Sequence, residues 1–285
     1  MKEKKSSGLF LFFIYILPKN LFSRITGYVA AAKLPKFILR PFMAWFIRKY
    51  NVNVDEAEHP PEHYASLNLF FTRRLKEGVR PIDSKPGILV SPVDGAVSEF
   101  GDIVDGRLIQ AKGLEYTLDG LLDCPEHVEK YRGGKYLVIY LSPPDYHRIH
   151  TPCAGRVLAY SYAPGKLFPV NEAAVHGIRN LFPRNERLTT YVENKSGNVA
   201  LVKVGATNVG KISVVYDDII TNGWIRRRHL RQYENEIKVE RGDELARFNM
   251  GSTVVLVFEK DKVDILPEVV SGRKIRLGEP IAKFK

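Results

Sequence analysis

The chain has 285 residues, of which 45% are hydrophobic and 26% charged, and its formal net charge is +11. This composition is typical of a folded globular protein and excludes a disordered, collagen-like or low-complexity chain. Two cysteines, Cys124 and Cys153, are too few for a disulfide framework in a chain of this length. We therefore expect two reduced thiols.

The positive charge is concentrated at the N-terminus. Residues 1–50 contain ten lysines and arginines and one acidic residue, a net charge of +9 out of the total of +11. The apolar run "GLFLFFIYIL", residues 8–17, is shorter than the roughly 20 residues that a membrane-spanning helix needs. The alanines at 30–32 lie too far beyond this run for a signal-peptide cleavage site.

Residues 20–50 intersperse aromatic and aliphatic side chains with lysine and arginine, and Pro35 and Pro41 divide them into short predicted segments. Basic amphipathic helices of this kind suit the headgroup layer of an anionic membrane. The alternative is a helical subdomain that packs on the rest of the protein. A nucleic-acid partner is disfavoured, because the apolar content is too high for an arm that follows phosphates.

After Tyr50 the sequence changes, and the acidic, Pro-Pro-containing stretch that follows marks a boundary. We predict a helical membrane-association region over residues 1–60 and a β-rich domain over 61–285. Short helices are expected at Ser66–Leu75 and Leu114–Leu122. Strands are expected at Ile88–Val90, Tyr136–Leu141, Arg156–Tyr162, Leu188–Val192, Val199–Val204, Lys211–Tyr216 and Thr253–Glu259. Because strands and helices do not alternate regularly, the predicted class is α+β.

Three stretches contain residues suited to chemistry. In "SPVDGAV", Asp94 lies in an Asp-Gly sequence that by itself indicates a hairpin turn. In "YLSPPDYHRIHTPCAG", His147 and His150 follow a hydrophobic strand. Such a pair could be half of a metal site, with His176 or Asp145 as further ligands, a general acid and base, or two solvated loop residues.

The third stretch is "RFNMGSTVVLVFE", in which Gly251 and Ser252 precede a predicted strand. A serine hydroxyl in this position could attack the carbonyl of the preceding glycine, which lacks a Cβ that would crowd the attack. An ester would replace the amide, β-elimination would cut the chain, and the new N-terminus would become a pyruvoyl group. That ketone could form a Schiff base with an amine and act as an electron sink. The chemistry needs a base and an orienting carboxylate, which Asp94 and one of the histidines could supply.

Taken together, these stretches resemble the phosphatidylserine decarboxylases, in particular the bacterial membrane-associated type. The resemblance runs in order along nearly the whole chain, through "PKNLFSRITG", "NLFFTRRLKEGVRPID", "LVSPVDGAVSEFG", "IQAKGLEYTLDGLL", "YLSPPDYHRIHTPCAGRV", "YAPGKLFPVN", "NLFPRNER", "VGATNVGKI" and "MGSTVVLVF".

The resemblance implies a role for each matching residue. Cleavage between Gly251 and Ser252 would give chains 1–251 and 252–285, with Ser252 becoming the pyruvoyl cofactor in place of pyridoxal phosphate and without a metal. Asp94 and His150 would form the self-cleavage triad with Ser252. His147 would act in decarboxylation, as proton donor to the substrate carbanion.

The resemblance also implies partners and a location. The substrate would be phosphatidylserine, converted to phosphatidylethanolamine and CO2. The two chains of one precursor would stay associated, in a homodimer bound peripherally to the cytoplasmic face of the bacterial membrane. The basic run "WIRRRHLRQ", residues 224–232, could contact headgroups, although a solvated loop is the simpler interpretation.

Three alternatives remain open at this point. The same chemistry could act on a different lipid headgroup. A metal-dependent lipid hydrolase could use His147, His150 and His176. A non-catalytic membrane-surface adaptor would need no chemistry at residue 252.

Overall fold

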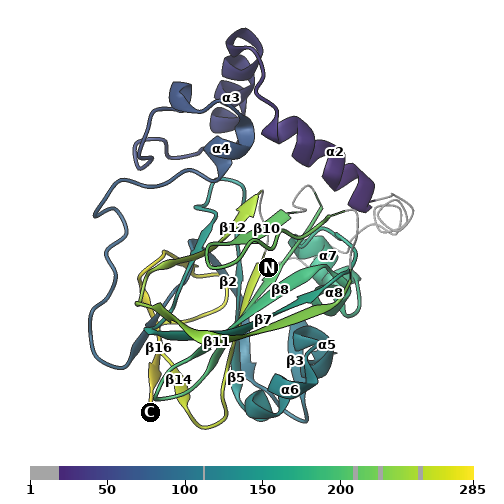
Figure 1. Ribbon diagram of the computed structural model, residues 1–285, viewed down its shortest axis with the longest axis vertical. Helices are drawn as coiled ribbons and strands as arrows, with labels where there is room; N and C mark the ends of the chain where they lie inside the picture. Colours follow the sequence, from purple (N-terminus) through teal and green to yellow (C-terminus); the bar gives the residue numbers. More distant parts are fainter. Residues whose placement is uncertain (1–18, 112, 208–210, 224–226, 250–252) are drawn as a thin grey trace.

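A computed structural model describes residues 19–285, apart from residues 112, 208–210, 224–226 and 250–252. The helical part of the chain lies at one end of the molecule, above the sheets (Figure 1). Its elements are α2 (Lys19–Ala31), α3 (Lys36–Tyr50), the 3-10 turn η1 (Pro61–His63) and α4 (Leu67–Phe71). None of the helices in the described part of the chain is both long and apolar enough to cross a bilayer.

The three N-terminal helices share a small hydrophobic core of their own. It contains Leu39, Met43 and Phe46 from α3, and Phe70 and Phe71 from α4. This core extends beyond residue 60, so α4 packs with the helices although it lies in the predicted β-rich domain. The domain boundary at residue 60 stays a prediction.

The expectation that Pro41 breaks the helical segment is wrong. Pro35 directly precedes α3, but Pro41 lies inside it and the helix continues to Tyr50. A proline inside a helix removes one backbone hydrogen bond, at a cost of about 3 kcal/mol. The burial of Leu39, Met43 and Phe46 on the other side of the helix offsets this cost.

An antiparallel sheet of eight strands forms the centre of the β-rich part, in the order β11-β7-β8-β9-β13-β5-β2-β15. The strands are β2 (Gly95–Asp102), β5 (Lys135–Tyr140), β7 (Gly155–Ala163), β8 (Arg187–Glu193), β9 (Val199–Val204), β11 (His229–Val239), β13 (Thr253–Phe258) and β15 (Lys274–Ile275). All seven predicted strands are confirmed within two residues at either end, and the α+β class is confirmed.

Smaller sheets and helices cover both faces of this sheet. On one face, two three-stranded sheets pack on the large sheet and complete a hydrophobic core. The first sheet contains β1 (Ile88–Val90), β16 (Pro280–Phe284) and β14 (Val263–Ile265). The second contains β10 (Lys211–Val214), β12 (Glu244–Asn249) and β6 (Arg148–His150). On the other lie the hairpin β3 (Arg107–Ala111) and β4 (Leu114–Thr117), and the helices α5 (Leu118–Leu122), α6 (Pro125–Val128), η2 (Glu129–Tyr131), α7 (Glu172–Gly177) and α8 (Leu181–Arg184).

The run "TVVLVF" is apolar throughout because β13 is buried on both faces. Val254, Leu256 and Phe258 enter the core shared with the small sheets, whereas Val255 and Val257 enter the core beneath the helices. The strand pairs with β5 on one side and β9 on the other over its entire length. It is therefore fixed by two ladders of hydrogen bonds and two hydrophobic cores.

Three local predictions are corrected. The helix expected over Leu114–Leu122 begins only at Leu118, because Gly113 has φ +78° and reverses the chain so that β4 pairs with β3. The helix expected over Ser66–Leu75 ends at Phe71. The loop expected over 224–232 is wrong for residues 229–232, which belong to β11 at the edge of the large sheet, where charged side chains reach solvent.

Candidate active site

The predicted cleavage bond joins Gly251 and Ser252, which lie outside the described residues. The strands on either side of it are well defined. β12 ends at Asn249, and β13 begins at Thr253, which is buried and pairs with Tyr140 of β5. Tyr140 also pairs with Ala96 of β2, so Thr253 and Ala96 lie two strands apart, at a distance of about 10 Å.

Asp94 directly precedes β2 at this same end of the sheet. Its carboxylate Oδ1 accepts hydrogen bonds from the backbone N–H of Leu277 at 2.8 Å and from Arg80 Nε at 2.9 Å. Its Oδ2 accepts from Arg80 Nη2 at 2.6 Å. Asp94 therefore does more than form a bend before β2. Arg80 and Leu277 hold its buried carboxylate in a fixed position.

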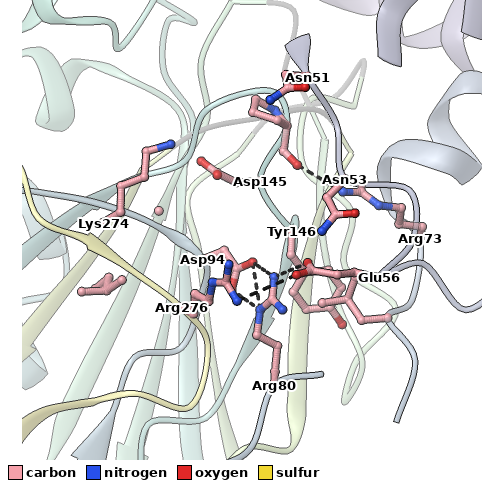
Figure 2. Close-up of a pocket in the computed structure, with 14 residues that line it drawn as sticks. Asn51, Asn53, Glu56, Arg73, Arg80, Asp94, Asp145, Tyr146, Lys274 and Arg276 are labelled. Atoms are coloured by element: carbon pink, nitrogen blue, oxygen red, sulfur yellow. Dashed lines mark hydrogen bonds and ion pairs between the residues drawn. The ribbon is translucent and has the colours of Figure 1, made fainter. Parts of the chain in front are cut away.

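Arg80 also binds a second carboxylate, that of Glu56 (Figure 2). Its Nη2 donates to Glu56 Oε2 at 2.7 Å, and its Nη1 donates to the carbonyl of Val79 at 3.0 Å. The hydrogen bond from Arg80 lowers the pKa of Glu56. Glu56 follows α3 by six residues, so this network connects the helical region with the start of β2.

His150 lies in β6, and its backbone is tied to the segment that carries Asp94. Its N–H donates to the carbonyl of Pro92 at 2.8 Å. Its ring Nδ1 lies 2.7 Å from the carbonyl oxygen of Gly242, so Nδ1 carries the proton and Nε2 is free to accept one. The hydroxyl of Tyr146 lies 3.2 Å from Nε2 and donates to it. Burial lowers the pKa of His150, which leaves this imidazole a neutral base at pH 7.

The side chains of Asp94 and His150 are close enough to interact through their charges, but each has its own hydrogen-bond partners. The negative charge of Asp94 favours the protonated form of His150 and opposes the effect of burial. In this structure the Nδ1 proton of His150 is bound by Gly242 and the carboxylate of Asp94 by Arg80 and Leu277. The proposed triad therefore has a backbone carbonyl where a triad carboxylate would orient the base.

His147 is completely buried just before β6. Its Nδ1 donates to the carbonyl of Asp145 at 2.7 Å, and its ring packs against Phe71 with centroids 3.9 Å apart. Its Nε2 has no hydrogen-bond partner among the described residues. Burial lowers the pKa of His147 to about 3, so the ring is neutral and Nε2 carries a lone pair.

The end of α4 fixes the loop that carries both histidines. Phe71 packs on His147, the carbonyl of Thr72 accepts from Arg148 Nε at 2.9 Å, and Arg73 Nη2 donates to the carbonyl of Pro144 at 3.1 Å. Three successive residues thus contact the loop from Pro144 to Arg148. The loop joins β5 to β6, so this contact also sets the position of β6.

A polar cavity of about 260 Å³ lies between these elements (Figure 2). Of the candidate catalytic groups, Asp94 lines the cavity, whereas His147 and His150 are not among its lining residues. Tyr146 lines the cavity and contacts His150 through its hydroxyl, Asn51 and Asn53 line it from the segment after α3, and Lys274 lines it from β15. The cavity is smaller than the ~300–1,000 Å³ typical of sites for drug-sized molecules. It therefore suits a small polar group better than a whole lipid.

The described residues contain no cluster of three or more histidine, cysteine or acidic side chains with the geometry of a metal site. His176 lies in α7, where its Nδ1 is bound by the carbonyl of Glu172 at 2.8 Å. His147, His150 and His176 therefore do not supply the joint ligand set that the hydrolase alternative needs.

Comparison with known proteins gives the context of this site. The sequence profile of the phosphatidylserine decarboxylase family matches residues 67–283. A relative from Myxococcus xanthus is 44% identical over 273 residues, which cover 95% of this chain and 97% of the relative. Relatives from Pseudoalteromonas translucida and Brevibacillus brevis are 44% and 41% identical, over 95% and 100% of this chain and 96% and 100% of their own lengths. All three carry the name phosphatidylserine decarboxylase proenzyme.

The chain belongs to the phosphatidylserine decarboxylase family. The family match confirms the resemblance that the sequence motifs indicate, and it spans every residue assigned a role there. Four residues of the site were not among the sequence-based candidates, namely Glu56, Arg73, Arg80 and Tyr146. Arg73 and Arg80 lie in the quoted stretch "NLFFTRRLKEGVRPID", and Tyr146 directly precedes His147, but nothing in their local pattern indicates which partners they meet.

Replacing Arg80 by methionine should destabilise the protein strongly. Arg80→Met removes the cation that binds the buried carboxylate of Asp94 and leaves Glu56 with only Arg276, at 3.8 Å; breaking a buried ion pair in this way costs about 3–5 kcal/mol. Glu56 has a lowered pKa, so its contribution is complete above its usual pKa of 4.5 and is lost as the pH falls through the lower folded value. Urea unfolding at pH 7 and pH 4 measures the free energy of unfolding of the proteins with and without Arg80→Met, both carrying Ser252→Ala.

The matched control is Arg132→Met, because Arg132 forms its ion pairs with Asp119 and Glu129 at the surface. This control should leave stability nearly unchanged. Equal stabilities of the Arg80→Met and Arg132→Met proteins at pH 7 would contradict the assigned role of the network.

Acid should destabilise the protein partly through His147. The unfolded chain binds a proton to this residue below pH 6.5, whereas the folded chain does so only near pH 3. Stability is therefore complete above pH 6.5 and falls as the pH decreases from 6.5 to 3, by up to about 1.4 kcal/mol per pH unit from this group. His147→Gln should show a correspondingly shallower decline in urea unfolding across that window.

The control for this experiment is His59→Gln, which changes a half-exposed histidine. Its stability should follow the wild-type pH dependence. Parallel curves for wild type and His147→Gln would show that the folded protein binds a proton at residue 147 as easily as the unfolded chain does.

Proposed function

We propose that this protein converts phosphatidylserine to phosphatidylethanolamine and CO2, with a pyruvoyl group made from its own Ser252. The observation that carries the proposal is the 44% identity to a phosphatidylserine decarboxylase proenzyme over 95% of the chain. The arrangement near the start of β13 supports it, because the buried carboxylate of Asp94 lines a polar cavity together with Tyr146, the hydroxyl of which contacts the neutral base His150.

The first reaction is self-cleavage. The Ser252 hydroxyl attacks the carbonyl carbon of Gly251, the peptide C–N bond breaks and an ester forms. Loss of the serine Hα and β-elimination then release a carboxylate on Gly251 and leave dehydroalanine at position 252. Hydrolysis of dehydroalanine gives the ketone and ammonia.

His150 is the base for this reaction. Its Nε2 carries a lone pair because Gly242 holds the Nδ1 proton, and it can take the proton from the serine hydroxyl once that hydroxyl replaces the Tyr146 hydroxyl as its hydrogen-bond donor. Protonation gives the ring a positive charge, which the carboxylate of Glu244 and, to a smaller extent, the carboxylate of Asp94 stabilise. Arg80 and Leu277 keep that carboxylate in place. Asp94 then acts through its charge on the ring.

The residues present fit a ketone at position 252 that reacts with an amine. When formed, the group supplies an electron sink for the pair released as CO2 leaves. His147 offers Nε2, a buried lone pair without a partner among the described residues, for proton transfer. We propose that this atom takes a proton from the substrate ammonium, once the negative charge of the bound substrate raises the low pKa of the buried ring, and returns it to the substrate Cα after CO2 has left. The proton-donor role expected for His147 thus requires that it first act as a base.

The cleavage proposal predicts two chains in the purified protein, of residues 1–251 and 252–285. Ser252→Ala and His150→Ala should leave one uncut chain, because they remove the nucleophile and the base. His147→Ala should be cut but should lose decarboxylation by at least about 100-fold, the usual contribution of a general acid or base. Denaturing electrophoresis with mass analysis measures cleavage, and release of labelled CO2 from phosphatidylserine measures activity.

Two outcomes would contradict this proposal in different ways. An intact single chain that decarboxylates phosphatidylserine would exclude the pyruvoyl group. A correctly cut protein that releases no CO2 from phosphatidylserine would keep the cleavage chemistry and overturn the substrate, in favour of a different headgroup.

We further propose that α2 and α3 lie on an anionic membrane surface. Large apolar side chains are exposed on both helices, namely Leu21, Phe22, Ile25, Tyr28, Val29, Phe37, Ile38, Phe42 and Trp45. Lysines and arginines, among them Lys33, Lys36, Arg40, Arg48 and Lys49, are exposed on the same segment. Exposed apolar surface with adjacent positive charge is the pattern of a helix in the headgroup layer. Dimerisation and the cytoplasmic face stay predictions.

The double substitution Phe37→Glu with Trp45→Glu should weaken membrane binding by at least about tenfold, because it removes two large side chains from the apolar layer and adds two negative charges. Flotation with vesicles that contain anionic lipid measures the bound fraction. Val104→Glu, at an exposed apolar residue outside the helices, should bind like wild type. Unchanged flotation of the double variant would refute this role of the helices.

A further inference from the structure

Arg73 is a buried cation that has no carboxylate partner among the described residues, and its guanidinium lies over the ring of Phe70, 5.3 Å from the ring centroid. Only 4% of the residue is exposed, and its guanidinium makes one hydrogen bond, from Nη2 to the carbonyl of Pro144. Its Nε has no hydrogen-bond partner among the residues that the structure describes. Burying a charge is costly unless it is paired, and the neighbouring buried arginines obey this rule. Arg80 is paired with Asp94 and Glu56, and Arg148 with Glu244.

The guanidinium of Arg73 lines the polar cavity, whose acidic groups are already bound elsewhere. Glu56 and Asp94 are held by Arg80, and Asp145 Oδ2 accepts from the N–H and the hydroxyl of Ser142 at 2.7 and 2.6 Å. Figure 2 shows Arg73 on one side of the cavity and Lys274 on the other. The cavity thus presents a buried cation without an anion to match it, which is the condition for binding an anionic ligand.

We propose that Arg73 binds the phosphodiester of the substrate headgroup, an inference that rests on the proposed function. The planar guanidinium can donate two parallel hydrogen bonds to phosphate oxygens, and burial strengthens such bonds. A cavity of about 260 Å³ accommodates a headgroup while the acyl chains remain outside. Asn51 and Asn53, which follow α3, line the same cavity, so its wall is continuous with the helices proposed to lie on the membrane.

The chemistry of decarboxylation favours the phosphodiester over the substrate carboxylate. The carboxylate loses its charge as CO2 leaves, so a cation bound to it would stabilise the starting state more than the transition state. The phosphodiester keeps its charge throughout the reaction, and binding it orients the headgroup without opposing CO2 loss. Because Arg73 also contacts Pro144, the headgroup would be anchored to the loop that carries His147.

Two small anions without an amine separate these possibilities, since neither can react with a ketone. Glycerophosphoglycerol carries a phosphodiester but no carboxylate, and glycerate carries a carboxylate but no phosphate. Each is titrated into the full-length protein and followed by NMR, with wild type, Arg73→Gln and Arg107→Gln compared. Arg107 is an exposed arginine of β3 and serves as the matched control.

We expect Arg73→Gln to raise the Kd for glycerophosphoglycerol on the order of 10- to 100-fold, the range for a lost hydrogen bond to a charged group, and Arg107→Gln to leave it unchanged. Binding of glycerate should change little. An equal Kd for glycerophosphoglycerol in wild type and Arg73→Gln, no binding to wild type, or a loss confined to glycerate would each overturn the proposal.

Arg73→Lys guards against a failure of Arg73→Gln to fold. Lysine keeps the charge but cannot form the two parallel bonds, so the Kd for glycerophosphoglycerol should rise by less than in Arg73→Gln but remain above wild type. An unchanged Kd in Arg73→Lys, with Arg73→Gln unfolded, would count against the phosphate role.

A parallel assay of phosphatidylserine decarboxylation separates this inference from the proposed function. Arg73-dependent phosphodiester binding in a wild-type protein without decarboxylase activity would leave the anion site intact and refute the function. Decarboxylase activity with binding that is independent of Arg73 would refute the anion site alone.

Discussion

The candidate site depends on one contact, between the end of α4 and the loop that joins β5 to β6. Phe71, Thr72 and Arg73 each contact that loop, and the loop positions His147 and the strand that carries His150. The side chain of Phe71 belongs to the hydrophobic core of the N-terminal helices. Because Phe71 also packs on His147, the packing of the N-terminal helices affects the orientation of the His147 ring. The helical region thus contributes to the site itself, in addition to the membrane contact proposed for it, because it forms one wall of the site.

The distribution of buried charge explains how the site keeps its catalytic groups fixed. Arg80 holds Asp94 and Glu56 together, and a carboxylate in that position cannot turn freely toward another partner. His150 is instead oriented by the carbonyl of Gly242. The His150 N–H also binds the carbonyl of Pro92, two residues before Asp94. None of these hydrogen bonds involves the bond between Gly251 and Ser252, so cutting that bond would leave them in place. Arg73 differs from the paired arginines, and its unmatched charge gives the cavity a preference for anions.

The sequence predicts strands well where they are short, apolar and bounded by turn residues, as at Ile88–Val90 and Val199–Val204. It predicts strands poorly at the edge of a sheet, as in β11, where most side chains are exposed and many are charged. The sequence of such an edge strand resembles that of a solvated loop. The helix expected from Leu114 was half strand because a single glycine with positive φ reverses the chain. At the site, the sequence motifs identify the candidate reacting groups, but not the residues that hold those groups in position. Glu56 lies 24 residues before Arg80 and Asp94 lies 14 residues after it, and only the folded chain shows that both bind its guanidinium.

The position of β13 explains how a chain could be cut next to a central strand of its large sheet and still hold together. The segment after residue 252 forms β13 between β5 and β9, β15 beside β2, and β16 between β1 and β14. Its Leu277 also donates the backbone hydrogen bond to Asp94. Separating the two proposed chains would expose both hydrophobic cores that β13 enters and would break ladders along three strands. The same hydrogen bond means that Asp94 is fixed by the small chain although it belongs to the large one. If the chain is cut at the proposed bond, the site is built from both chains, and the pairing of β13 with β5 and β9 would hold them together while residue 252 changes chemically.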